Sequence, residues 1–213
     1  MDLPFAVFDM DGTLIDSMGS WYEICRTFLR ACGVNDFSEE IIRQTGALTM
    51  DESAALLTGV YGLCVPQAEA AARLDELMLR CYETSVPAKS GVKAYLDRLS
   101  RNGTQMCVAS ASPVHAIRSC LDRLDLLPYF SFLLSCDDVG AGKTDPAVYR
   151  EAARRFGATP RSVAVFEDSL SSLQTAKRAG FFTVAVYDEN AAAAWGTLSS
   201  LADETVRDWN DLL

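Results

Sequence analysis

The chain has 213 residues, of which 49% are hydrophobic and 23% charged, and this balance is typical of a folded globular protein rather than a disordered one. Its 29 acidic residues outnumber its 19 lysines and arginines, which gives a formal net charge of −10 at pH 7. An anionic surface repels phosphate backbones and anionic lipids, so we expect neither nucleic acid nor a membrane as a partner. A small anionic substrate remains compatible with this charge, provided that its site is locally positive.

Histidine and cysteine usage narrows the chemistry and the compartment. His115 is the single histidine, which argues against a zinc site built on several histidines and against a Ser-His-Asp triad. The seven cysteines contain no CxxC pair and lie in apolar stretches, as buried core residues do. We therefore expect a reducing cytoplasm, with no disulfide framework and no structural zinc. We also expect no signal peptide and no membrane span, because no basic leader and no apolar run of about 18 residues is present.

The first part of the chain predicts one strand and then only helices. The apolar run Phe5–Phe8, closed by Asp9, is typical of a buried strand. Over residues 16–86 the apolar residues recur at helical spacing. The expected helices run from about residue 17 to a stop at Gly33, in two short segments within 38–61 broken at Thr45-Gly46, and over 67–85.

After a break at 87–91, helices and strands alternate. The expected strands are Gln105–Ala109, Phe132–Leu134, Val163–Phe166 and Phe182–Val186, and the expected helices begin near residues 92, 114, 146 and 170, with an Ala-rich helix near 191–201 and a short segment around Val206. Asp145 and Pro146 predict an N-cap followed by the first helical residue. The alternation indicates an α/β fold with a parallel sheet covered on both faces, and the early helical block indicates a second, smaller unit.

Polar side chains follow four of the expected strands. Asp9 and Asp11 come after the first and Ser110 after the second, Lys143 lies in the loop after the third, and Glu167 and Asp168 come after the fourth. Ligands bind beyond the carboxyl ends of the strands in an open parallel sheet. One acidic pair alone is usually a solvated turn. Two pairs in one sheet, with a lysine between them, predict a site.

The charges expected at this edge of the sheet require compensation. Asp9, Glu167 and Asp168 would carry three negative charges, and two such charges about 4 Å apart repel by about 4 kcal/mol at an effective dielectric constant near 20. A divalent cation relieves this repulsion, and ligation by oxygen alone favours Mg²⁺. A phosphoryl group would then be held by the cation, by Lys143 and Ser110, and by backbone N–H groups of the turn at 11–13.

Four segments carry a family resemblance. DMDGTLIDS (Asp9–Ser17), VASAS (Val108–Ser112), GKTDPAVY (Gly142–Tyr149) and VAVFEDSLSSLQTAKRAG (Val163–Gly180) resemble, in order and spacing, the four motifs of the haloacid dehalogenase superfamily of aspartate-nucleophile phosphotransferases. The resemblance covers essentially the whole chain. It implies a Rossmann-like core.

The resemblance also implies a division into domains. The core would comprise residues 1–15 and 88–213, and an inserted all-helical cap would comprise residues 16–87. This cap resembles the small helical cap (C1 cap) of the subgroup that contains beta-phosphoglucomutase and phosphoglycolate phosphatase.

The resemblance assigns the central chemistry to two aspartates. Asp9 would be the nucleophile that forms an aspartyl-phosphate. Asp11 would be the general acid that protonates the leaving oxygen and then the base that activates water. The side chains of Asp9 and Asp168, with the backbone carbonyl of Asp11, would bind Mg²⁺. Glu167 would be a further ligand or a neighbour of the ligands.

Phosphate binding is assigned in the same way. Ser110 and Lys143 would bind the phosphoryl oxygens and take part in catalysis. Gly12, Thr13 and Ala111 complete the expected phosphate-binding set, with Thr13 orienting the first loop.

The expected function is a Mg²⁺-dependent phosphatase that acts on a small phosphorylated metabolite. A sugar phosphate, phosphoglycolate and a nucleoside monophosphate all remain open as substrates, and we expect a monomer or weak dimer. A phosphomutase of the beta-phosphoglucomutase type is the nearest alternative. Thr13 stands where those mutases often carry valine, and Asp16–Cys32 contains no histidine, so the phosphatase is favoured. Thr144 replaces a common proline after Lys143, which would affect only the stiffness of the loop.

Two alternatives come from other classes of protein. A phospho-acceptor signalling module uses a similar acidic cluster but is smaller and lacks a cap. A catalytically silent phosphate-binding protein with this fold would usually have lost Asp9 or Asp11, and both are present.

Other notable side chains have simpler explanations. Cap residues near 43–50 and the first cap helix would select the substrate, but Arg43 itself is more often solvated than in contact with a ligand. His115 is expected to be partly exposed at a helix start. Trp21 is expected to belong to the cap core rather than to an aromatic binding site.

Overall fold

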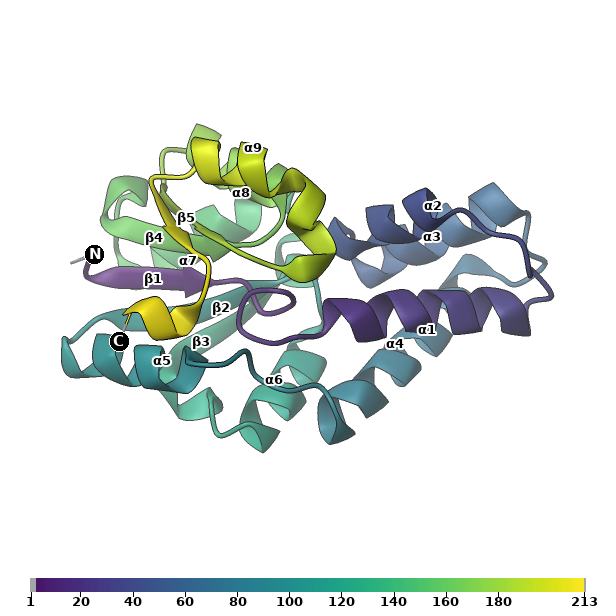
Figure 1. Cartoon of the computed structure of the whole chain (residues 1–213), viewed down its shortest axis with the longest axis horizontal. Helices are drawn as coiled ribbons and strands as arrows, with labels where there is room; N and C mark the ends of the chain where they lie inside the picture. The colour runs from purple at the N-terminus through teal and green to yellow at the C-terminus, as the bar shows by residue number, and fades with distance from the viewer. Residues whose placement is uncertain (1–2, 213) are drawn as a thin grey trace.

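A single parallel sheet forms the centre of the larger part of the molecule, on the left in Figure 1. The structure, a computed structural model, describes residues 3–212 and gives only the backbone of Ala47. Within this part of the chain six strands pair in the order β3-β2-β1-β4-β5-β6, and every neighbouring pair is parallel. The strands are β1 (Phe5–Phe8), β2 (Gln105–Ser110), β3 (Phe130–Ser135), β4 (Val163–Glu167), β5 (Phe182–Val186) and β6 (Glu204–Val206). The predicted α/β class is therefore confirmed.

Helices cover both faces of this sheet. Successive residues of a strand point to opposite faces, so Ala6 and Phe8 of β1 belong to one hydrophobic cluster and Val7 belongs to another. The first cluster includes buried residues of α5 (Val92–Arg101) and α6 (Val114–Arg123). The second includes buried residues of α7 (Ala147–Phe156) and part of α8 (Leu170–Arg178). The helix α9 (Trp195–Leu201) packs beside α8. Because both faces are covered, the central strands are continuous apolar runs.

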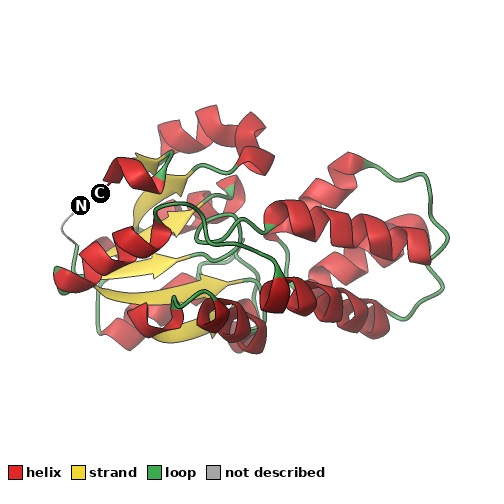
Figure 2. Cartoon of the chain, turned by 60° about the horizontal axis from the view of Figure 1, so that its bottom comes forward, coloured by secondary structure: helices red, strands yellow, loops and turns green. Residues whose placement is uncertain are grey.

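Four further helices lie together beyond the carboxyl ends of the strands (Figures 1 and 2). They are α1 (Met18–Ala31), α2 (Glu39–Gln44), α3 (Met50–Tyr61) and α4 (Gln67–Thr84), and we call them the helical unit. Buried residues such as Leu29 in α1, Leu57 in α3 and Leu74 in α4 belong to the same hydrophobic cluster as Phe8 of the sheet. The helical unit is therefore packed onto the core, and α4 lies against α6.

Two segments join the helical unit to the sheet, and backbone hydrogen bonds hold them side by side. The Asp16 N–H donates to the Pro87 carbonyl at 3.0 Å, and the Lys89 N–H donates to the Leu14 carbonyl at 2.9 Å. The chain thus leaves and re-enters the core at one place.

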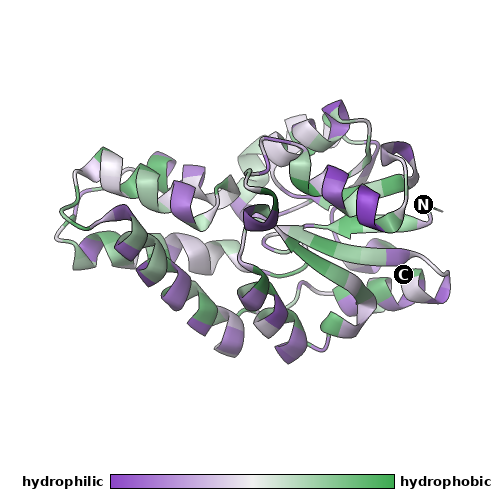
Figure 3. Ribbon diagram, turned by 180° about the vertical axis from the view of Figure 1, so that it is seen from behind, coloured by the Kyte–Doolittle hydropathy of each residue, from purple (hydrophilic) through white to green (hydrophobic). Residues whose placement is uncertain are grey.

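The surface of the molecule is largely polar. Hydrophilic residues lie along the outward turns of many helices in both parts of the molecule (Figure 3). On α4, Arg73 pairs with Glu69 and Arg80 with Glu76 at the i,i+4 spacing that suits an exposed helix face. Of the helices between residues 3 and 212, none has both the length and the apolar character needed to cross a bilayer.

The predicted start of α7 is wrong by one residue. Pro146, expected as the first helical residue, is the N-cap, and the helix begins at Ala147. The Asp145 carboxylate accepts a hydrogen bond from the Ala147 N–H at 2.8 Å. This Asx-type turn extends the capping segment past the proline and delays the helix.

The Ala-rich helix expected near 191–201 is only partly α-helical. Residues Glu189–Ala194 form a 3₁₀ helix, and α9 begins at Trp195. The buried Asp188 side chain pairs with Lys89 at 2.9 Å and accepts from the Asn190 N–H at 2.9 Å. These contacts fix a tight first turn, which takes the 3₁₀ form despite the alanine content.

Cysteine burial also departs from expectation in part. Cys25, Cys107, Cys120 and Cys136 are buried in the core, as expected, whereas Cys64 is exposed. It lies in the loop between α3 and α4, where the chain has turned away from the core.

Candidate active site

The site lies where the chain changes direction across the sheet. From β1 the chain passes to β2 and β3 on one side and returns to β4 on the other. Such a switch point leaves a crevice beyond the carboxyl ends of the two central strands, where ligands bind in open α/β sheets. The Asp9 N–H donates to the Phe166 carbonyl at 3.0 Å, which places Asp9 beside Glu167 at the end of β4.

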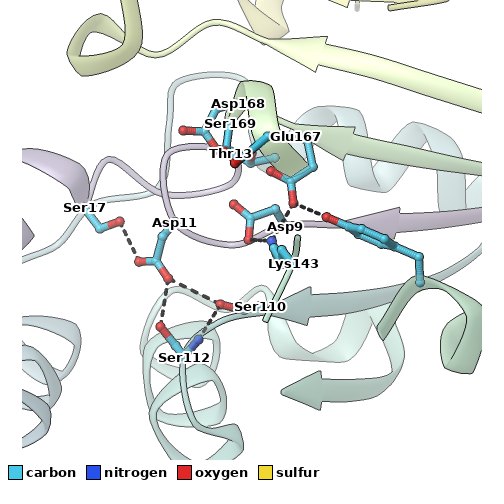
Figure 4. A network of polar contacts seen from close by, with 12 residues as sticks. Asp9, Asp11, Thr13, Ser17, Ser110, Ser112, Lys143, Glu167, Asp168 and Ser169 are labelled. Atoms are coloured by element: carbon cyan, nitrogen blue, oxygen red, sulfur yellow. Dashed lines mark hydrogen bonds and ion pairs between the residues drawn. The ribbon is translucent and has the colours of Figure 1, made fainter. Parts of the chain in front are cut away.

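A buried lysine joins two of the predicted carboxylates. Lys143 donates to Asp9 Oδ1 and, at 2.6 Å, to Glu167 Oε1 (Figure 4). The Tyr149 hydroxyl donates to the same Glu167 oxygen at 2.8 Å. Burial alone lowers the pKa of Lys143, but the Asp9 and Glu167 carboxylates outweigh it and hold the pKa above its usual range. Lys143 is therefore a fixed positive charge at the base of the site.

The acidic groups outnumber this lysine. Carboxylate oxygens of Asp9, Glu167 and Asp168 all lie within 4.8 Å of one another, and all three residues are buried. Burial, together with the Glu167 and Asp188 carboxylates, raises the pKa of Asp168 to about 7. Burial also raises the pKa of Asp9, and the neighbouring carboxylates add to this effect while Lys143 opposes it.

One oxygen of this cluster has no protein partner. Glu167 Oε2 is buried and accepts no hydrogen bond. Buried polar atoms without a partner are rare in folded proteins. An orphan oxygen, two further carboxylates and one compensating lysine together fit a divalent cation such as Mg²⁺, which prefers oxygen ligands.

Gly12 allows the first loop to pass directly over this cluster. Its φ of +77° lies in the left-handed region that favours glycine. A Cβ atom at this position would overlap the Asp168 carboxylate, with the carboxyl carbon only 2.7 Å away. The next residue, Thr13, is fully buried and donates from its hydroxyl to Asp168 Oδ1 at 3.2 Å. Gly12 and Thr13 thus shape the position of Asp168.

Asp11 lies in a separate cluster of hydroxyl groups (Figure 4). Its Oδ1 accepts from Ser17 Oγ and from the Tyr82 hydroxyl, each at 2.6 Å, and its Oδ2 accepts from Ser112 Oγ at 3.0 Å. Ser110 Oγ lies 3.5 Å from Oδ2 and accepts from the Ser112 N–H at 3.0 Å. Burial and the Asp11 carboxylate raise the pKa of Tyr82 well above its usual range, so Tyr82 remains a donor. These contacts fix the direction of the Asp11 carboxylate.

A partly open cavity of about 60 Å³ lies between the strand ends and the helical unit. Asp9, Asp11, Ser110, Ala111 and Lys143 line its core side, together with Glu167 and Asp168. The helical unit contributes Met18, Trp21, Thr45, Gly46, Leu48, Met50, Met78 and Tyr82.

The other expected site residues are placed as follows. Of the phosphate-binding residues expected from sequence, Ser110, Ala111 and Lys143 line the cavity, whereas Gly12 and Thr13 lie behind it against Asp168. Trp21 belongs to the buried core, as expected, and also lines the cavity.

Two other candidates lie away from the cavity. Arg43 is exposed and does not line the cavity. His115 is exposed, and its Nε2 lies 3.5 Å from Asp75 of α4.

Sequence reasoning missed two tyrosines of the site. Leu74, Met78 and Tyr82 are spaced four residues apart and share the buried face of α4, so the spacing would have placed Tyr82 on that face. Leu77 and Cys81, which are also apolar and close to this spacing, are only partly buried. The second tyrosine is Tyr149. No sequence signal indicates that its hydroxyl would bind Glu167.

The comparisons with known proteins agree with this geometry. A model of the haloacid dehalogenase-like hydrolase family matches residues 6–186, and the chain belongs to this family. The family resemblance of the four motifs is therefore confirmed.

Two relatives and one solved structure illustrate the likeness. Hexitol phosphatase B of Escherichia coli K12 is 28% identical over 210 residues, which cover 95% of each chain. The phosphorylated carbohydrates phosphatase of Thermotoga maritima is 28% identical over 174 residues, which cover 82% of this chain and 80% of the relative. The crystal structure of CbbY from Rhodobacter sphaeroides in complex with xylulose-(1,5)bisphosphate has a TM-score of 0.86 at 20% identity, over 99% of this chain and 96% of that one, and shares the fold.

Proposed function

We propose that the chain is a Mg²⁺-dependent phosphatase that hydrolyses a small phosphomonoester, with Asp9 as the nucleophile. One observation carries the proposal: a buried carboxylate at the end of β1 is held by Lys143 and lies within 4.8 Å of two further carboxylates that line the same side of the cavity. The relatives named as phosphatases of hexitols and of phosphorylated carbohydrates support a phosphorylated metabolite as the substrate class.

The first half of the reaction uses the two aspartates in different ways. The Asp9 carboxylate attacks phosphorus, and the bond between phosphorus and the leaving oxygen breaks with its electron pair on that oxygen. Asp11 gives the leaving oxygen a proton, and its direction is set by Ser17, Tyr82 and Ser112. The products of this step are an alcohol and an aspartyl-phosphate on Asp9.

The second half regenerates the enzyme. A water molecule gives a proton to Asp11 and attacks phosphorus, and the bond to the Asp9 oxygen breaks with its electron pair on the carboxylate. Lys143 and Ser110 would hold the phosphoryl oxygens in both steps.

The metal site is assigned to the same residues. Asp9 and Asp168 with the Asp11 carbonyl would hold Mg²⁺, and Glu167 would lie beside or within the ligand set. When bound, the cation supplies positive charge that offsets the repulsion between these carboxylates and the anionic substrate.

The helical unit is assigned the role of a cap. Residues 16–87 would move relative to a core of residues 1–15 and 88–213, and the hydrogen-bonded segments at 14–16 and 87–89 are the place for a hinge. In the packed arrangement the helical unit lines one side of the cavity; closure would exclude bulk water during attack, and opening would admit substrate and release phosphate.

The side of the cavity that the helical unit forms argues against the phosphomutase alternative. A mutase must hold a bisphosphorylated intermediate, whose second phosphate requires a positive partner. Among the described residues that line the cavity from the helical unit, none is a lysine, arginine or histidine.

Substitution of the aspartates tests the proposal. Asp9→Asn should abolish release of phosphate from p-nitrophenyl phosphate, and Asp11→Asn should lower kcat for alkyl phosphates by about 10²- to 10⁴-fold, the usual value of general acid–base catalysis. Chelation of divalent cations should abolish activity reversibly. Asp36→Asn, at an exposed position between α1 and α2, is the matched control and should retain full activity. Full activity of Asp9→Asn, or of the chelated enzyme, would refute the mechanism.

A further inference from the structure

The wall of the cavity opposite the acidic cluster is made of apolar side chains. Met18 and Trp21 come from α1, Leu48 from the segment before α3, Met50 from the start of α3, and Met78 from α4. We call these five residues the apolar wall. Leu48 is half-buried and lies outside the hydrophobic core clusters, so it faces the cavity without being required for packing.

The polar atoms beside the apolar wall are already used within the protein. Trp21 Nε1 donates to Thr45 Oγ1 at 2.8 Å, and that hydroxyl donates to the Ile42 carbonyl at 2.6 Å. The Tyr82 hydroxyl donates to Asp11 and lies 3.0 Å from Ser112 Oγ. Among the described side chains that the helical unit contributes to the cavity, no uncommitted hydrogen-bonding group is left for a ligand.

This arrangement has a direct consequence for the leaving group. The phosphoryl group must lie at Asp9 and Lys143, so the remainder of the substrate extends toward the apolar wall. A hydroxyl group placed there loses hydrogen bonds to water and finds no uncommitted side-chain partner in the helical unit, which is unfavourable; the one unpartnered hydroxyl among the described lining residues, that of Ser172, belongs to α8 of the core. A methylene group placed there gains contact with methionine and leucine side chains.

Resting on the proposed phosphatase function, we propose that the substrates are phosphomonoesters with an apolar leaving group, rather than polyol phosphates or bisphosphates. The leaving group lies against the apolar wall. The chain would differ in this respect from its relative named as a hexitol phosphatase.

Matched pairs of esters test this inference. Propyl phosphate and glycerol 3-phosphate share a three-carbon chain, and hexyl phosphate and sorbitol 6-phosphate share a six-carbon chain, so each pair differs in hydroxyl groups alone. We expect kcat/KM to be at least tenfold higher for propyl phosphate than for glycerol 3-phosphate. The preference for hexyl phosphate over sorbitol 6-phosphate should be at least as large. The hydroxyl groups make the polyol the better leaving group, so a preference for the alkyl ester reports binding at the wall.

The outcomes separate this inference from the proposed function. Hydrolysis with equal or greater kcat/KM for glycerol 3-phosphate and sorbitol 6-phosphate would overturn the inference and leave the phosphatase intact. If neither these esters nor p-nitrophenyl phosphate are hydrolysed in the presence of Mg²⁺, the proposed function fails, and the inference fails with it.

A pair of variants locates the effect. Leu48→Asn places an amide in the apolar wall and should reduce the preference for propyl over glycerol phosphate at least threefold. Leu63→Asn is the matched control, since Leu63 is also half-buried in the helical unit but does not line the cavity. Its preference should equal that of the unmodified enzyme. If Leu48→Asn changes the preference no more than Leu63→Asn does, the leaving group does not lie against this wall and the inference is wrong.

Discussion

Three hydroxyl groups that hold Asp11 come from three distant parts of the chain. Ser17 precedes α1, Tyr82 lies on α4 and Ser112 follows β2. Tyr82 belongs to the helical unit, so the direction of the Asp11 carboxylate depends on the helical unit being packed against the core. The structure thereby links the position of the proposed general acid to the position of the helical unit.

Removing the Tyr82 hydroxyl should therefore impair proton transfer more than binding. Tyr82→Phe deletes one hydrogen bond to a charged group, which is worth about 1.5–3 kcal/mol. We expect kcat for propyl phosphate to fall by roughly 10- to 100-fold, and kcat for p-nitrophenyl phosphate to change little, because nitrophenolate leaves without a proton. Steady-state kinetics on the two esters measures the difference.

Tyr61→Phe provides the control for this prediction. The Tyr61 hydroxyl accepts from the Ser38 N–H at 2.9 Å in the same helical unit, away from the cavity. Its loss should affect stability without changing the ratio of the two rates. Equal losses on both esters in Tyr82→Phe would mean that Tyr82 only stabilises the fold.

Gly12 and Gly33 offer a second comparison at the scale of single residues. Both have positive φ, +77° and +85°, but a Cβ at Gly33 would meet no atom within 4 Å, whereas one at Gly12 would overlap Asp168. Each alanine variant should lose about 1–2 kcal/mol of unfolding free energy from the left-handed backbone. Gly12→Ala should in addition lose at least 100-fold in kcat/KM, because the Asp168 carboxylate is displaced.

Urea denaturation and kinetics on the two alanine variants check this expectation. Comparable loss of activity in both variants would show that backbone strain, rather than the overlap with Asp168, is responsible.

At the scale of elements, Asp203 ties β5 to the segment before β6. Its Oδ2 accepts from the Thr183 N–H and the Thr183 hydroxyl, each at 2.8 Å, and its Oδ1 pairs with Lys177 of α8. Burial alone raises the pKa of Asp203, but the hydrogen bonds from Lys177 and Thr183 outweigh it and lower the pKa below its usual value.

This lowered pKa gives the contribution of Asp203 a defined pH dependence. A carboxyl group whose pKa is lower in the folded state stabilises the protein above its unfolded pKa, near 4, and the stabilisation is lost as the pH falls through the folded value. Asp203→Asn should lower the unfolding free energy by about 1 kcal/mol at pH 7. The difference in unfolding free energy between the unmodified protein and Asp203→Asn should persist to pH 5 and narrow below pH 4, as measured by urea denaturation. A gap that stays constant below pH 4 would exclude the ionised carboxylate as its source.

The sequence predicts the elements that are determined by residues nearby in the chain. The strands were predictable because β1 and β4 are apolar runs ended by acids, and parallel pairing then brings Asp9, Glu167 and Asp168 to one edge. The 3₁₀ helix at Glu189–Ala194 was not predictable, because it depends on the contact between Asp188 and Lys89, which lie about a hundred residues apart in the chain.

The same distinction holds within the site. Lys143 was predictable from its family motif in the loop that follows β3, and it pairs with Asp9. Tyr82 and Tyr149 reach the site from helices, and their positions depend on how α4 and α7 are rotated and packed. The spacing along α4 places Tyr82 on its buried face, but tertiary contacts decide which group its hydroxyl meets.

For the whole molecule, the distribution of charge explains how an acidic protein can accept an anion. The chain carries a formal net charge of −10, and the cavity itself contains more carboxylates than lysines. Long-range repulsion is screened beyond about 8 Å at physiological ionic strength, so the local balance at the site decides binding. Lys143 and a bound divalent cation would together supply that balance.

The packing of the helical unit completes the site. The core supplies both aspartates and the lysine, whereas the helical unit supplies the apolar wall and the Tyr82 hydroxyl. Residues of both parts line the cavity.

Chemical trapping of the phosphorylated intermediate tests the central claim most directly. The enzyme is quenched during turnover of propyl phosphate or p-nitrophenyl phosphate and treated with borohydride, which reduces an acyl phosphate of aspartate to homoserine. Peptide mass spectrometry should then find homoserine at position 9 of the enzyme quenched during turnover. In the Asp11→Asn variant, no homoserine should be found before substrate is added. Turnover without modification at Asp9, or with the acyl phosphate at another residue, would contradict the account.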